Sequence, residues 1–178
     1  VGGAVAVQSS LGGAQTDELG APRRRWRGGM CDCLGVFCNG LFWQGWCCNP
    51  FLLGQLAQRM NLNVCGSPGG NTSNTCSSIS VLFCVYLAFW LIGLSACLWP
   101  FMFVYVIILA MNIRLNYRKK YEIAPSCFEC CDGMLDDFCC ALFCECCVGI
   151  QMARHTHDER QYPYQCCSET GLTSNAPA

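Results

Sequence analysis

The sequence predicts a mostly α-helical membrane protein, built as a helical hairpin with cysteine-rich caps and irregular tails. Three observations predict this class. No Asp, Glu, Lys, Arg or His occurs between Arg59 and Arg114. The 35 residues from Ile79 to Ile113 are almost all apolar, which exceeds the roughly 20 residues needed to cross a bilayer. Cysteine supplies 19 of the 178 residues, far above its ordinary share.

The composition agrees with this class and excludes others. Hydrophobic residues make up 53% of the chain, charged residues make up 13%, and the net charge is −1. A nucleic-acid-binding protein needs a basic face to neutralise phosphates, so nucleic acid is not an expected partner. We expect membrane lipid as a partner, together with further copies of the chain or other membrane subunits. The odd number of cysteines means that disulfides cannot account for all of them.

Composition divides the chain into three parts. Residues 1–25 form a flexible tail, 26–154 a cysteine-rich domain, and 155–178 a polar C-terminal tail. Within the domain, membrane segments are expected near 34–60 and 79–113. In the first segment Asn49 and Pro50 favour the start of a helix. That segment is uncharged up to Arg59, but polar residues lower its hydrophobicity. It therefore fits a second span, a re-entrant segment or an interfacial helix.

The second membrane segment is expected to form one long, kinked span. As a single helix, residues 79–113 would extend about 52 Å, against a hydrocarbon core of about 30 Å. The segment is too short for two full spans and a turn. Pro100 lies between two apolar runs, where it removes a helix hydrogen bond and favours a kink.

Basic residues predict the orientation. Four of them directly follow the long apolar segment, and cytoplasmic loops favour Lys and Arg: Arg114, Arg118, Lys119 and Lys120. The arginines at 23–25 and 27 are expected on the same side. This topology leaves the turn-rich loop 61–78 on the opposite face of the membrane, where the glycosylation sequon at Asn71 would be meaningful.

A second cysteine block at 127–147 has the spacing of a metal site. Cys127-x2-Cys130, thirteen residues and Cys144-x2-Cys147 match a four-thiolate zinc site. Disulfides and free buried thiols fit the same residues, and the sequence does not separate the three. Zinc is therefore a possible cofactor rather than a certain one.

The polar residues around this block indicate structure rather than catalysis. Asp136 or Asp137 can cap a helix that runs from Phe138 toward His157. His155 and His157 are expected at a solvated helix end. Because the sequence contains no phosphate-binding loop and no paired-carboxylate arrangement, the chain is not expected to be an enzyme.

Four blocks resemble a known family in the family's order. They are Trp26-Arg-Gly-Gly-Met-Cys-Asp-Cys33, the segment CNPFLLGQLAQ at 48–58, Arg114-x3-Arg118-x2-Tyr121-x-Ile123-x2-Ser126-Cys127, and Cys144-x2-Cys147-x3-Gln151-x2-Arg154. They resemble the cysteine-rich family that includes cornifelin, placenta-specific protein eight, plant cadmium-resistance proteins and plant cell-number regulators. Phe42, Trp43 and Pro50 stand where transport-associated plant members carry cysteines, and Ile150 also replaces a usual cysteine.

The resemblance implies a non-enzymatic integral membrane protein that acts through assembly, with divalent-cation homeostasis or transport as its activity. The alternative is an accessory, structural subunit of a large heteromeric membrane complex. Both fit the plasma membrane or an organellar membrane.

Overall fold

The computed structural model describes residues 21–30, 32, 40–93, 95–125, 133–156 and 164–173. Within these ranges the chain is helical and contains no β-strand, which confirms the predicted mostly α class. The five helices are α1 (Gly40–Cys47), α2 (Asn49–Arg59), α3 (Thr75–Leu91), α4 (Ser95–Tyr121) and α5 (Gly133–Thr156).

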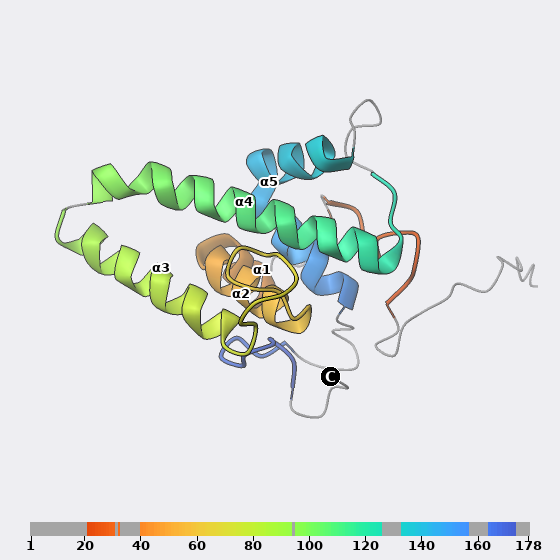
Figure 1. The fold of residues 1–178 in the computed structure, drawn as a ribbon, viewed down its shortest axis with the longest axis horizontal. Coiled ribbons are helices and arrows are strands. Elements are labelled where there is room, and N and C mark those ends of the chain that lie inside the picture. The colour runs from red at the N-terminus through yellow and green to blue at the C-terminus, as the bar shows by residue number, and fades with distance from the viewer. Residues whose placement is uncertain are drawn as a thin grey trace, which may run out of the picture.

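Helices α3 and α4 are the two legs of a helical hairpin, joined by a short turn that lies far from the other helices (Figure 1). The turn is at Gly93, whose φ of +81° is a conformation that other residues rarely adopt. The prediction of one long helix kinked at Pro100 is therefore wrong. Pro100 lies inside α4, and the chain reverses seven residues earlier, where glycine permits it.

One described helical stretch, Leu98–Tyr121 of α4, is long and apolar enough to cross a membrane. Helix α3 is apolar but has only 17 residues. The predicted segment near 34–60 contains α1 and α2, with 8 and 11 residues. At about 1.5 Å per residue each is far shorter than the bilayer core, so neither is a second full span. A re-entrant or interfacial position for this segment remains a prediction.

The helix predicted after Asn49-Pro50 is confirmed as α2. Its apolar face is fully buried and supplies the centre of the core, through Leu52, Leu53 and Leu56. The second half of α4 and the second half of α5 pack around it. Their buried contributions include Leu109, Ala110 and Ile113 from α4, and Val148, Ile150, Met152 and Ala153 from α5.

The loop between α2 and α3 packs along the second half of α4. Asn112 Nδ2 donates to the Cys65 carbonyl at 2.8 Å, and Asn116 Nδ2 donates to the Gly66 carbonyl at 2.9 Å. These contacts place loop 61–74 directly beside the basic end of α4. The predicted topology, with residues 61–78 and 114–120 on opposite faces of a membrane, is therefore not confirmed.

Residues 164–173, which we call the C-terminal strap, lie against α2. Gln55 Nε2 donates to the carbonyls of Cys166 at 2.8 Å and Ser168 at 2.7 Å. Arg59 Nε donates to the Thr170 carbonyl. The strap contains no helix, as expected for an irregular tail, yet these hydrogen bonds hold it on the helical body.

Candidate functional site

A buried ionic network joins α4 to α5. Arg114 Nε donates to Asp137 Oδ1 at 3.0 Å, and Arg118 Nη1 donates to Asp137 Oδ2 at 2.8 Å. The side chains of Arg114 and Asp137 are completely buried. The prediction that Asp136 or Asp137 caps a helix is wrong. Helix α5 begins earlier, at Gly133. The carboxylates of Asp136 and Asp137 face Arg118, at the basic end of α4.

The same network brings together three of the four blocks that carry the family resemblance. Arg114 Nη1 donates to Gln151 Oε1 at 2.6 Å, and Gln151 Nε2 donates to the Gly28 carbonyl at 3.0 Å. The guanidinium carbon of Arg114 lies 4.7 Å from the centre of the Trp26 ring, a cation–π contact. Residues more than a hundred positions apart therefore meet at the base of the hairpin.

His155 belongs to this buried region and is not at a solvated helix end, so that prediction is wrong. Its side chain is completely buried. Its ring lies edge-on to Trp26 at 5.2 Å and to Tyr121 at 4.5 Å, and its Nδ1 accepts the Arg27 backbone N–H at 3.3 Å. The aromatic neighbours and the backbone donor give His155 a structural role. His157 lies outside the described residues.

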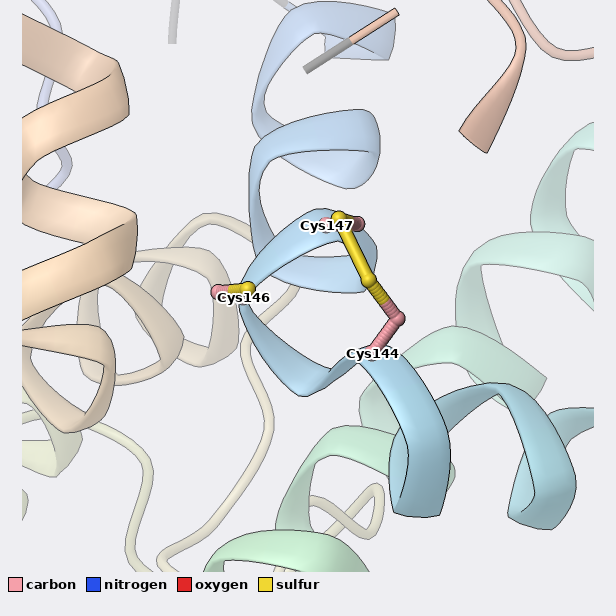
Figure 2. Close-up of side chains that lie close together, drawn as sticks. All are labelled: Cys144, Cys146 and Cys147. Carbon is pink, nitrogen blue, oxygen red and sulfur yellow. A yellow bond between two sulfur atoms is a disulfide. The ribbon is translucent and has the colours of Figure 1, made fainter. Parts of the chain in front are cut away.

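The predicted zinc ligands fall into two groups. Cys127 and Cys130 lie outside the described residues, so the four-thiolate set as a whole remains a prediction. Cys144 and Cys147 form a disulfide bond, which was one of the alternatives for these residues. They lie at a kink in α5, where Cys144 leaves helical geometry with φ −150° and ψ 56° (Figure 2).

Cys146 adds a third sulfur at this kink. In Figure 2 its side chain points away from the Cys144–Cys147 disulfide. The three Sγ atoms nevertheless lie within 4.8 Å of one another. After reduction, these thiols offer ligands of the type that zinc prefers, so the kink fits a metal ion in its reduced form. As a disulfide, Cys144 and Cys147 offer no thiolate.

A second group of thiols lines a cleft of about 790 Å³ between α1, α2, the start of α3 and the C-terminal strap. Four free cysteines contribute to its walls: Cys48, Cys76, Cys166 and Cys167. Trp43 and Phe51 form apolar walls, and Glu169 supplies a carboxylate. We call this space the thiol cleft.

The strap completes the thiol cleft, because two of the four thiols come from it. Its position depends on polar contacts at the cleft floor, where the Tyr164 hydroxyl is hydrogen-bonded to Gln44 and Gln55. Gln44 Nε2 also donates to Gln55 Oε1 at 3.2 Å. These contacts fix the strap over α2 and set Cys166 and Cys167 at the mouth of the cleft.

Burial disfavours the thiolate form of two cleft cysteines, Cys48 and Cys166. Burial raises the pKa of the Cys48 thiol, and the neighbouring Cys47 raises it further. Burial and the adjacent Cys167 likewise raise the pKa of the Cys166 thiol. Reactive catalytic cysteines have a lowered pKa, so these groups are protonated at neutral pH until a metal ion displaces the proton.

The thiols are less closely grouped in the cleft than at the kink. Among the described residues, the three sulfur atoms of the kink, within 4.8 Å of one another, are the group placed to share a metal ion, and the cleft thiols form no such group. An ion held by cleft thiols therefore requires the strap to move inward. The sequence contained one signal for this site, the vicinal pair Cys166-Cys167, and nothing in its pattern linked that pair to Cys48 or Cys76.

Comparison with known proteins agrees with the resemblance seen in the sequence. No curated protein sequence and no solved structure matches the chain. The PLAC8 family matches residues 26–155, which include α1 to α5 up to the penultimate residue of α5 but not the C-terminal strap. The match covers well over half of the chain and contains the buried network of Trp26, Arg114 and Gln151. The chain therefore belongs to the PLAC8 family.

Proposed function

We propose that this chain is a non-enzymatic integral membrane protein of divalent-cation homeostasis, which acts as an assembly of several copies. The observation that carries this proposal is the thiol cleft, where four free thiols from three separate parts of the chain line one space. Thiolate sulfur is a preferred ligand of zinc and of softer metal ions. Membership of the PLAC8 family is consistent with such a role.

The charges of the described residues support a binding role over a catalytic one. The buried Arg114 and Arg118 both pair with Asp137. The residues that line the cleft include no histidine, and Glu169 is the charged residue among them. The lining therefore lacks the histidine that most often serves as the base beside a nucleophilic thiol.

The lack of charged residues in the hairpin favours an assembly of several copies of the chain. Ion pathways in membranes usually contain polar or ionisable side chains, and residues 60–113 include no Asp, Glu, Lys, Arg or His. One hairpin by itself therefore offers no charged path for a cation. Movement of ions across the membrane would need several copies around a shared path, whereas capture of ions needs only the thiol cleft.

Zinc binding by the purified, reduced chain tests the proposal. We expect about one bound zinc per chain at the cleft, and at least about a tenfold loss of affinity in the double variant Cys166→Ser/Cys167→Ser, which removes two thiolate ligands. The matched control is Cys65→Ser/Cys84→Ser, since both of these cysteines are free and exposed but lie outside the cleft.

A third variant separates the cleft from the kink. Cys144→Ser/Cys147→Ser removes two of the three thiols at the kink in α5 and leaves the cleft intact. Binding that disappears only in this variant would assign the metal to the kink and contradict the cleft. Absence of zinc binding in the reduced wild-type chain would end the cation proposal.

The second candidate is an accessory subunit of a larger membrane complex. Large aromatic side chains exposed on α1 and the first half of α5 favour it: Trp43, Trp46, Phe138 and Phe143. Aromatic residues are enriched at protein interfaces. Phe143 is 77% exposed, so a photoreactive residue at this position should crosslink to a partner protein if the chain is such a subunit. Migration of the detergent-extracted chain as a homo-oligomer would contradict this candidate.

A further inference from the structure

The outer part of the α3–α4 hairpin is apolar around its whole circumference. Helix α3 buries only its first residues, through Thr75, Cys76 and Ile79. From there to the turn, large apolar side chains are exposed at nearly every position, and α4 continues the pattern beyond the turn. They are Val81, Leu82, Val85, Leu87, Phe89, Trp90, Leu91, Ile92, Trp99, Phe101, Phe103, Val104 and Ile108.

The distribution of these side chains favours lipid over a partner protein. A helix that packs against one partner needs one apolar stripe, whereas a helix that is apolar all round is either buried or surrounded by lipid. Val81, Leu82 and Leu87 point in three different directions around α3, since successive residues are about 100° apart. A single partner groove would leave part of this surface in water.

The length of the hairpin suits a bilayer. Beyond the residues that pack into the core, α3 from Ser80 to Leu91 extends about 18 Å, and α4 from Ser95 to Tyr105 extends about 17 Å at 1.5 Å per residue. Both lengths are a little over half the thickness of the hydrocarbon core, which is about 30 Å. The two legs therefore reach deep into the core, and the turn at Gly93 carries no charge that would have to reach water beyond it.

Both legs begin from the same polar body. Asn112 and Asn116 of α4 hold the loop that leads into α3 through the Cys65 and Gly66 carbonyls. Lys119 and Lys120 follow on α4 and are exposed. Lysines beside a membrane favour anionic headgroups and the cytoplasmic side. The start of α3 and the end of α4 both lie away from the turn that joins these helices (Figure 1).

We infer that the α3–α4 hairpin enters the bilayer from one face, with lipid acyl chains as the molecules that cover it. Loop 61–74 and the lysines at 119–120 stay together on the entry face, and the turn at Gly93 stays inside the membrane. This inference rests on the membrane residence in the proposed function, and it is independent of the metal.

Photocrosslinking at Val85 tests what covers the hairpin. Val85 is 47% exposed on α3. With a photoreactive residue at Val85, in native membranes, we expect adducts with lipid. The same residue at Asn71, an exposed position of the polar loop 61–74, is the control and should give none. A protein adduct at Val85 in place of lipid would assign this surface to a partner subunit and overturn the inference.

Amine labelling of sealed membrane vesicles tests the entry from one face. The chain has two lysines, Lys119 and Lys120, so they report the basic end of α4 without any substitution. Asn71→Lys adds a reporter at an exposed position of the loop. With a membrane-impermeant amine reagent, we expect both sites to be labelled from the same side, and neither from the other side.

Each other outcome has a distinct meaning. Labelling of residue 71 and of the native lysines from opposite sides would overturn the inference while leaving membrane residence intact. Release of the chain from membranes by alkaline carbonate would overturn both the inference and the membrane part of the proposed function. Resistance to carbonate, together with labelling from one side and lipid adducts at Val85, supports both.

Discussion

Replacing Asp137 by asparagine should destabilise the base of the hairpin strongly. The substitution keeps the size of the side chain and removes its charge. Asp137 accepts hydrogen bonds from Arg114 at 3.0 Å and from Arg118 at 2.8 Å, and the first of these arginines is completely buried. The variant therefore leaves a buried guanidinium without its anionic partner.

The magnitude follows from the burial of the network. Removing one partner of a buried ion pair typically costs about 3–5 kcal/mol, because the remaining charge stays desolvated. Asp136 Oδ2 remains 4.0 Å from Arg118 Nη1 and can compensate part of that charge. Arg114 keeps its hydrogen bond to Gln151 and its contact with Trp26. We therefore expect a loss of about 3 kcal/mol in the free energy of unfolding.

The assay is unfolding of the purified chain in mixed micelles, followed by tryptophan fluorescence, since Trp26 contacts Arg114 directly. The matched control is Glu122→Gln. Glu122 also pairs with an arginine, Arg24, but the two side chains are 57% and 84% exposed. Such a surface pair contributes about 0–1 kcal/mol, so the control should change stability little.

The comparison of the two variants can refute the reasoning. If Asp137→Asn lowers the free energy of unfolding no more than Glu122→Gln does, the network at the base of the hairpin does not stabilise the fold. An increase in stability for Asp137→Asn would contradict the account in the same way.

The remaining predictions concern packing, the turn and the strap. A methyl group added at Gly45 would lie 2.6 Å from Ile150 Cγ1, so Gly45→Ala should lower the free energy of unfolding by about 1–3 kcal/mol. Gly40→Ala, with open space around it, should be near neutral, and equal effects of the two would contradict the packing. Gly93→Ala should cost about 1–2 kcal/mol in the same assay because of its positive φ; no change would place the turn elsewhere. Gln55→Ala should free the strap and speed alkylation of its two cysteines, measured by mass spectrometry, and an unchanged rate would show that Gln55 does not hold it.

The local features of the chain could be predicted from its sequence better than its long-range contacts. Asn49-Pro50 marks the start of α2 correctly, and the long apolar run marks the region that forms α3 and most of α4. The break within that run was not predictable from hydropathy, because apolar residues continue on both sides of Gly93. Pro100 was the stronger helix-breaking signal, yet α4 accommodates it near its start.

The polar residues of the core were misassigned for a related reason. Asp137 and His155 are surrounded in the sequence by residues that suit helix ends, so local rules place them in solvent. Their partners, Arg114 and Trp26, are 23 and 129 positions away, and only the packed helices bring them together. The thiol cleft was missed for the same reason, because the strap that supplies Cys166 and Cys167 is far in the sequence from Cys48 and Cys76.

Zinc-edge X-ray absorption of the reduced, zinc-loaded chain tests the central functional claim most directly. The thiol cleft predicts a coordination shell dominated by sulfur, with Zn–S distances of about 2.3 Å. The variant Cys166→Ser/Cys167→Ser should lose sulfur ligands, while Cys65→Ser/Cys84→Ser should keep the wild-type spectrum. A shell of oxygen and nitrogen alone, or an unchanged sulfur shell in the strap variant, would contradict a metal held by the thiol cleft.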